Sequence, residues 1–106
     1  MIYTVKYYPE AEDDYENFND FQKNQIDKAI LKVLQNPLPQ NEGGYGKPLG
    51  NKRGQNLTGL CKIKLKKLGI RIVYELIRSD KAIDIVVIAA RADDEVYDIA
   101  AKRVSR

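Results

Sequence analysis

Cationic side chains crowd the segment KIKLKKLGIRIVYEL, residues 62–76, and no acidic residue appears in it before Glu75. A β-strand exposes every second side chain on one face. Lys62, Lys64 and Lys66 therefore share a face, and the apolar residues that alternate with them point toward a core. Like charges placed in a row repel each other, and this arrangement is typical of a site that holds a strong anion such as a phosphodiester.

The rest of the composition narrows the chemistry that this segment can perform. The chain has no histidine, which removes the usual general base and the usual zinc ligand. Its lone cysteine, Cys61, excludes an internal disulfide, fits a reducing cytoplasm and is interpreted as a small buried residue. The acidic run 93–95 is interpreted as the start of a helix rather than as a magnesium site. We therefore expect no metal and no cofactor.

Cationic catalysis is the chemistry that remains. A lysine can act as a base when neighbouring cations lower its pKa, and Lys62, Lys64 and Arg71 can crowd one another in this way. Arginine keeps its charge and can hold two phosphate oxygens at once, which stabilises negative charge as it develops at phosphorus.

Charge is distributed unevenly along the chain. Residues 1–20 carry one lysine against six acidic residues, whereas residues 47–78 carry nine basic residues against Glu75. The basic middle fits nucleic-acid binding, and a solvated basic face is an equal alternative. With 106 residues, no apolar run long enough for a membrane and no basic leader, we expect one domain, residues 1–106, located in the cytoplasm.

Periodicity predicts the elements that position these residues. Alternation predicts strands over 2–8, 60–66, 70–77 and 83–90, and helical spacing predicts a helix that starts near Pro9, a second over 21–35 and a third over 94–104. Asp20 and Asp93 are expected as N-caps, and residues 37–56 as a long loop. The order indicates an α+β fold: a small, mostly antiparallel sheet, two N-terminal helices packed on one face and a short C-terminal helix. The apolar strand 83–90 should be central.

The turn between the two basic strands decides where Arg71 lies. A two-residue turn at Lys67 and Leu68 would place Lys64 directly opposite Arg71. A longer turn with Gly69 in a left-handed conformation could move Arg71 to the other face. A shared phosphate site requires Arg71 on the lysine side.

The segments GLCKIKLKKLGIRIVYEL and ARADDEVYDIAAKR resemble the RelE group of the RelE/ParE toxins, from bacterial and archaeal toxin–antitoxin modules. The shared pattern is Lys-x-Lys, six residues, an arginine, nineteen residues, a second arginine, five residues and a tyrosine. In this chain it falls on Lys62, Lys64, Arg71, Arg91 and Tyr97. The resemblance covers the second half closely and the whole chain in the order of its elements. It implies the family's fold, which is similar to that of microbial ribonucleases.

The resemblance implies metal-independent cleavage of messenger RNA in the ribosomal A site. The ribose 2′-OH would attack its own phosphate and leave a 2′,3′-cyclic end and a 5′-OH. It implies that Lys62 and Lys64 are base candidates or stabilisers of the attacking oxygen, and that Arg71 holds the phosphoryl oxygens. Arg91 would stabilise charge at the leaving oxygen, and Tyr97 would stack on or orient a base or ribose.

Each of these residues also has a purely structural interpretation. Lys62 and Lys64 can be surface residues of a strand, Arg71 can pair with Glu75, and Tyr97 can anchor the last helix in the core.

Other basic residues are expected to contact messenger or ribosomal RNA. They are Lys47, Lys52, Arg53, Lys66 and Lys67. The family often has a basic residue in the loop before the Lys-x-Lys strand, and Gln55 occupies that position here. Arg53 would take its place.

The resemblance also implies partners. These are a cognate antitoxin, the ribosome with its RNA, and messenger RNA, with DNA bound only through the antitoxin complex and no membrane. Two alternatives stay open. One is a DNA gyrase inhibitor like the ParE branch, which lacks the basic constellation. The other is a non-catalytic RNA-binding regulator, which would bind with steep salt dependence and cut nothing.

Overall fold

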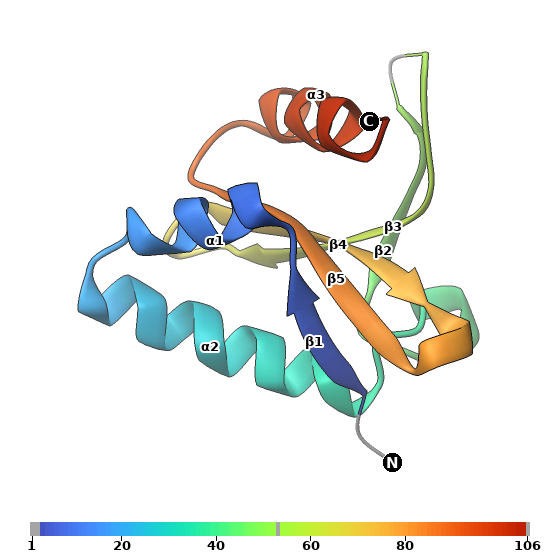
Figure 1. Cartoon of the computed structure of the whole chain (residues 1–106), viewed down its shortest axis with the longest axis horizontal. Helices are drawn as coiled ribbons and strands as arrows, with labels where there is room; N and C mark the ends of the chain where they lie inside the picture. Colours follow the sequence, from blue (N-terminus) through green and yellow to red (C-terminus); the bar gives the residue numbers. More distant parts are fainter. Residues whose placement is uncertain (1–2, 53, 106) are drawn as a thin grey trace.

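The computed structural model describes residues 3–52 and 54–105 and shows a five-stranded sheet with helices on both faces (Figure 1). Along the chain the elements are β1 (Thr4–Tyr7), α1 (Pro9–Glu16), α2 (Asp20–Gln35), η1 (Gln40–Glu42), β2 (Lys47–Lys52), β3 (Gln55–Leu65), β4 (Ile70–Ile77), η2 (Arg78–Asp80), β5 (Ala82–Ala89) and α3 (Asp93–Val104). The strand order is β1-β5-β4-β3-β2. The predicted α+β fold is confirmed.

Most of the sheet is antiparallel, as expected. The pairs β2–β3, β3–β4 and β4–β5 run antiparallel, and β1 alone among the described strands runs parallel to its neighbour, β5. β5 lies between β1 and β4 and is apolar on both sides, which is typical of an interior strand covered on both faces. Its interior position was predicted from that composition.

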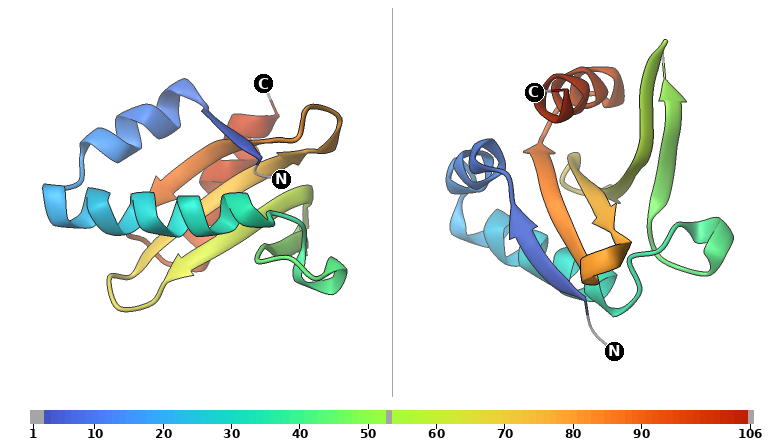
Figure 2. Two further views of the ribbon diagram at one scale, coloured as in Figure 1. Left: turned by 90° about the horizontal axis from the view of Figure 1, so that it is seen from below. Right: turned by 45° about the vertical axis from the view of Figure 1, so that its right-hand side comes forward.

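The two N-terminal helices cover one face of the sheet (Figure 2). Ala11 of α1 and Ile26 and Ile30 of α2 pack in one cluster with isoleucines of β4 and β5. Pro9 begins α1, as predicted, because its missing N–H costs nothing in a first turn. The N-cap of α2 is Asn19, so the prediction of Asp20 is wrong by one residue. Asn19 forms a capping box with Gln22, which Asp20 cannot do from its place inside the helix.

The third helix, α3, covers the opposite face. Val96 and Ala100 of α3 are fully buried against Val73 of β4 and Val86 of β5. A register shift between Val73 and Tyr74 turns two successive residues of β5, Val86 and Val87, toward this helix. Figure 1 shows α3 alone above this side of the sheet. The sheet is therefore enclosed between two helical layers.

The expected long loop over 37–56 is wrong in its second half. Residues 47–52 form β2, and β3 begins at Gln55, so the two strands make a hairpin that extends beside α3 (Figure 2). Leu49 and Leu57 are buried against α3, and Gln55 donates a hydrogen bond to Asp98 of that helix at 3.2 Å. Glycine, asparagine and proline have low strand propensity, so the sequence did not predict a strand here. An edge strand nevertheless tolerates these residues.

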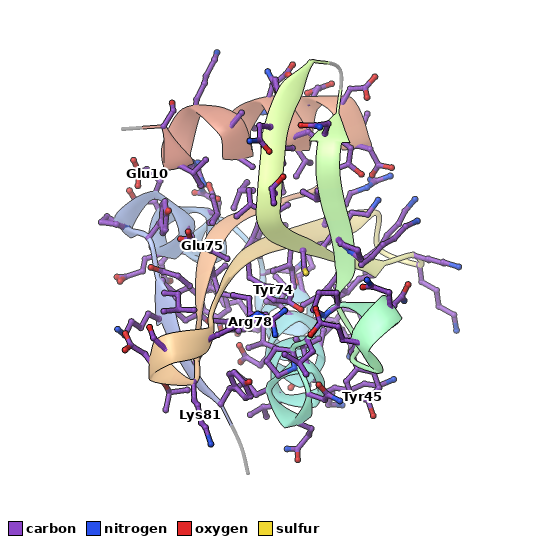
Figure 3. All side chains as sticks on the ribbon, turned by 90° about the vertical axis from the view of Figure 1, so that its right-hand side faces the viewer. Glu10, Tyr45, Tyr74, Glu75, Arg78 and Lys81 are labelled. Carbon is purple, nitrogen blue, oxygen red and sulfur yellow. The ribbon has the colours of Figure 1, made fainter. Side chains whose placement is uncertain are left out.

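Tyr74 ties the sheet to the segment after α2. It is fully buried, and its hydroxyl donates to the backbone oxygen of Pro37 at 2.6 Å. Burial raises the pKa of Tyr74, so the hydroxyl stays protonated and available as a donor. Figure 3 shows Tyr74 in the middle of the molecule and Tyr45 farther out, near η1.

Replacing Tyr74 with phenylalanine is expected to lower the free energy of unfolding by about 1–3 kcal/mol, because the buried oxygen of Pro37 loses its donor. Urea denaturation measures the loss. Tyr45→Phe removes the same hydroxyl from an exposed ring and is the control, expected to change stability by less than about 0.5 kcal/mol. Equal effects of the two substitutions would contradict the structural role of this hydrogen bond.

Candidate nucleic-acid interface

Lys64 and Arg71 lie directly opposite each other on β3 and β4. The pairing ends at Leu65 and Ile70, and residues 66–69 form the turn. Gly69 adopts a left-handed conformation, with φ of 67°, and Leu68 donates to the backbone oxygen of Leu65 at 3.1 Å. The turn thus has the left-handed Gly69 of the longer alternative, but it keeps the strand register that was expected from the two-residue alternative. Arg71 lies on the lysine face, as a shared phosphate site requires.

A second lysine row continues across the hairpin. Lys47 of β2 pairs opposite Lys62 of β3, so both side chains leave the same face of the sheet. Beside them is a cleft with a volume of about 470 Å³. The residues that line it are Gln40, Tyr45, Lys47, Lys62, Ile63, Lys64, Lys66 and Asp93. The cleft lies at the end of the sheet that α3 reaches with its first turn.

Lys62 is held firmly at the base of this cleft. Only 6% of it is exposed, and its Nζ donates to the Tyr97 hydroxyl at 2.8 Å and contacts an oxygen of Asp93 at 3.4 Å. The ammonium also lies 5.4 Å from the centre of the Tyr97 ring. Lys62 is therefore not the plain surface residue that its position on a strand allowed.

The expectation that crowding lowers the lysine pKa is wrong for Lys62. Burial by itself lowers this pKa, but the hydrogen bond to Tyr97 and the charge of Asp93 outweigh burial, and the pKa is raised. The raised pKa favours the ammonium form of Lys62, which suits it to donate to an anion. The sequence could not show this, because both partners come from α3.

Arg71 is fixed at two of its nitrogens. Its Nε donates to Asp93 at 2.8 Å and its Nη1 donates to the backbone oxygen of Gly69 at 2.9 Å. Its carboxylate partner is Asp93 and not Glu75, the partner that its purely structural interpretation allowed. Glu75 instead accepts a hydrogen bond from Tyr8 at 3.4 Å. A guanidinium held in this way presents its charge in a fixed direction.

Asp93 is the site residue whose role sequence analysis missed. It was expected to cap the last helix, but Ala92 is the N-cap and Asp93 is the first residue of α3. Burial raises its pKa, whereas Arg71 and Lys62 lower it, and the net result is a lowered pKa. In the sequence, Asp93 is visible only as an acidic residue two positions after Arg91. The sequence does not show how α3 lies across the sheet, so it could not connect Asp93 with β3 and β4.

Tyr97 anchors the last helix in the core, as its structural interpretation predicted. It packs in the core beneath α3, with 7% of its surface exposed, and its hydroxyl faces Lys62. Stacking on a base would need more of the ring than this surface offers, so positioning Lys62 is what the geometry supports.

Arg91 lies apart from the lysine cleft. Its guanidinium pairs with Glu95 at 3.1 Å and is 61% exposed. It lines a different cavity of about 590 Å³, together with Phe18 of the segment after α1 and Arg103 of α3. The structure thus brings together Lys62, Lys64, Arg71 and Tyr97. Arg91, the fifth residue of the motif, lines another cavity.

The other basic residues that were predicted to contact RNA differ in where they lie relative to the cleft. Lys47 and Lys66 line the cleft, Lys64 and Lys67 are exposed, and Lys52 ends β2. Arg53 lies outside the described residues, so its replacement of a basic residue at Gln55 stays a prediction. Gln55 itself is bound to Asp98.

The described residues offer neither a metal site nor a membrane-spanning helix. Within residues 3–52 and 54–105, no group of three or more His, Cys, Asp or Glu residues is arranged to hold a metal ion. In the same part of the chain no helix combines the length and the apolar character needed to span a bilayer.

Comparison with known proteins gives a consistent result. A family model of the ParE toxin of type II toxin–antitoxin systems matches residues 5–95. A proposed RelE-like toxin of Escherichia coli is 28% identical over 104 residues, which are 98% of this chain and 99% of that protein. The mRNA interferase toxin RelE of Escherichia coli strain K12 is 25% identical over the same coverage.

Solved structures share the fold. A mutant of Escherichia coli toxin RelE in the free state gives a TM-score of 0.75 at 24% identity and covers 98% of this chain and 99% of that chain. The same mutant in complex with a peptide of the antitoxin RelB gives 0.71 at 23% identity, with 97% and 98% covered. These likenesses establish the architecture around the cleft.

Proposed function

We propose that this chain, which belongs to the RelE/ParE superfamily and is a RelE-like toxin of a type II toxin–antitoxin system, cleaves messenger RNA in the ribosomal A site. The observation that carries the proposal is the convergence of Lys62, Lys64 and Arg71 on one face beside one cleft. Lys62 and Arg71 offer two positive charges to one phosphodiester, and Lys64 adds an amine beside them.

The proposed reaction needs no metal and no cofactor. The ribose 2′-OH attacks the adjacent phosphorus, the bond from phosphorus to the 5′-oxygen breaks, and a 2′,3′-cyclic phosphate and a 5′-OH result. Arg71 holds the phosphoryl oxygens, where a preorganised charge is most effective. Lys62, kept charged by Tyr97 and Asp93, stabilises the attacking oxygen. Lys64 is then the lysine candidate for accepting the proton of the 2′-OH.

Arg91 is proposed to stabilise charge at the leaving 5′-oxygen, which requires its exposed side chain to turn from the neighbouring cavity toward the lysine cleft when RNA binds. Its pairing with Glu95 is exposed and therefore weak, so exchange of that carboxylate for a phosphate costs little. The remaining basic residues are proposed to bind messenger and ribosomal RNA: Lys47, Lys52, Arg53, Lys66 and Lys67. The proton donor to the 5′-oxygen has no assigned residue in this mechanism.

A cognate antitoxin is the proposed protein partner. The structures of RelE with an antitoxin peptide support it, because the toxin in them has the fold of this chain. DNA would be bound only through the complex with the antitoxin.

Primer extension on translating ribosomes tests the proposed function. Purified chain added to ribosomes programmed with a defined message is expected to produce cuts within the A-site codon, with 2′,3′-cyclic ends, and to leave the free message intact. RNA that binds with steep salt dependence but stays uncut on ribosomes would favour the non-catalytic regulator.

A second candidate function is inhibition of DNA gyrase. The match of residues 5–95 to the ParE family model favours it. A supercoiling assay separates the two candidates: inhibited gyrase together with uncut message on ribosomes would refute cleavage. The lysine cleft favours RNA cleavage, because gyrase inhibition gives Lys62, Lys64 and Arg71 no common ligand.

A further inference from the structure

Asp93 introduces a negative charge into an otherwise cationic cleft. Among the described residues that line the cleft, it is the one acidic side chain, beside Lys47, Lys62, Lys64 and Lys66. A site built only to attract phosphate would gain nothing from it, because a carboxylate repels the incoming anion.

The two oxygens of Asp93 are divided between the two cations. Oδ1 accepts from Nε of Arg71 at 2.8 Å, and Oδ2 contacts Nζ of Lys62 at 3.4 Å. A phosphodiester has two non-bridging oxygens that can be shared between an arginine and a lysine in the same way. The carboxylate thus makes the contacts that the phosphate would make.

We propose that Asp93 is the resident counter-ion of the cleft, and that its carboxylate leaves Lys62 and Arg71 when a phosphate group binds between them. The link to RNA rests on the proposed function, whereas the exchange itself requires only a phosphate group.

Both cations can remain in place during this exchange. Lys62 keeps its hydrogen bond to the Tyr97 hydroxyl, and Arg71 keeps its hydrogen bond to the backbone oxygen of Gly69. The carboxylate has a path to solvent, because the Asp93 side chain is 37% exposed. Asp93 therefore compensates the two charges in the empty cleft, while other groups hold their positions.

The exchange makes the cleft selective. A free phosphate must displace the Asp93 carboxylate and therefore binds weakly. RNA that another surface, such as the ribosome, already holds next to the cleft must displace the same carboxylate, but its phosphate is present at a high effective concentration. This explains how a strongly basic cleft can require the ribosome.

Titration with inorganic phosphate, followed by NMR of the lysine side chains, tests the exchange. Asp93→Asn keeps the shape of the side chain and removes its charge. The variant is expected to bind phosphate roughly fivefold more tightly, because the repulsion between two negative charges about 4 Å apart in water is lost. Asp94→Asn is the matched control: it removes the same charge from the same helical turn, at a side chain that does not line the cleft. Its phosphate affinity is expected to stay within about 1.5-fold of the unmodified protein.

Unchanged or weaker phosphate binding by Asp93→Asn would overturn the proposal, as would an equal gain in Asp94→Asn. A second measurement uses the unmodified protein, in case the substitution prevents folding. The carboxyl carbon resonance of Asp93 is expected to shift in step with phosphate saturation, and a resonance that stays constant at saturation would also overturn it. Neither measurement involves RNA or ribosomes, so absence of message cleavage would refute the proposed function alone.

Discussion

Replacing Arg71 with alanine is expected to slow message cleavage on the ribosome by about 100- to 1,000-fold, the usual cost of losing one preorganised charge at a reacting centre. Arg71 lies on the strand opposite Lys64, and its hydrogen bond to the backbone oxygen of Gly69 holds it there when Asp93 gives way to a phosphate. Single-turnover primer extension with saturating enzyme measures the rate.

Two further variants make this result specific. Arg71→Lys keeps the charge and loses the planar fork, and is expected to give an intermediate rate. Lys28→Ala removes an exposed cation from α2, in the helical layer on the other side of the sheet, and is expected to leave the rate unchanged. A rate for Arg71→Ala within about threefold of the unmodified protein would remove Arg71 from the mechanism, provided that circular dichroism shows a folded variant.

Replacing Asp14 with alanine is expected to lower the free energy of unfolding by about 3 kcal/mol, because the substitution removes a partly buried carboxylate that accepts hydrogen bonds from Arg103 and from the backbone of Ile88. Asp14 of α1 accepts hydrogen bonds from Arg103 of α3 at 2.7 and 3.2 Å and from the backbone of Ile88 at 3.0 Å. Arg103 also donates to the backbone oxygen of Val86 at 2.8 Å. The pair joins both helical layers to β5, and its side chains are only 18% and 19% exposed.

The matched control is Asp13→Ala, which removes the neighbouring, exposed carboxylate of the same helix and is expected to change stability by less than about 0.5 kcal/mol. Thermal and urea denaturation of both variants give the comparison. Similar stability of Asp14→Ala and the unmodified protein would show that α1 and α3 are held to the sheet by apolar packing alone.

Local patterns predicted the elements that have strong periodicity. The apolar run 83–90 placed β5 in the interior of the sheet, and Pro9 marked the start of α1. The edge strand β2 was missed because its glycine and proline carry no strand signal, and only its pairing with β3 and its packing under α3 make it a strand. A cap is also decided by one or two side chains, which is why Asn19 was mistaken for its neighbour.

The site could be predicted only where its residues share a hairpin. Lys64 and Arg71 face each other because a short turn fixes the register of β3 and β4, and their spacing in sequence contains that information. The contribution of α3 depends on how a helix lies across the sheet. No spacing shows that Asp93 reaches Lys62 and Arg71, or that Arg91 pairs with Glu95 and lines another cavity.

The parallel pairing of β1 with β5 has a consequence for the order in which this protein matures. Thr4 pairs with Ala82 and Tyr7 with Ile85, so β1 has no partner strand until β5 has been synthesised, more than seventy residues later. Such distant pairing is slow, because a long stretch of chain must be ordered before any contact rewards it. α3 follows β5 and supplies Asp93 and Tyr97, so the basic cleft is completed only after β3, β4, β5 and the start of α3 have all been synthesised.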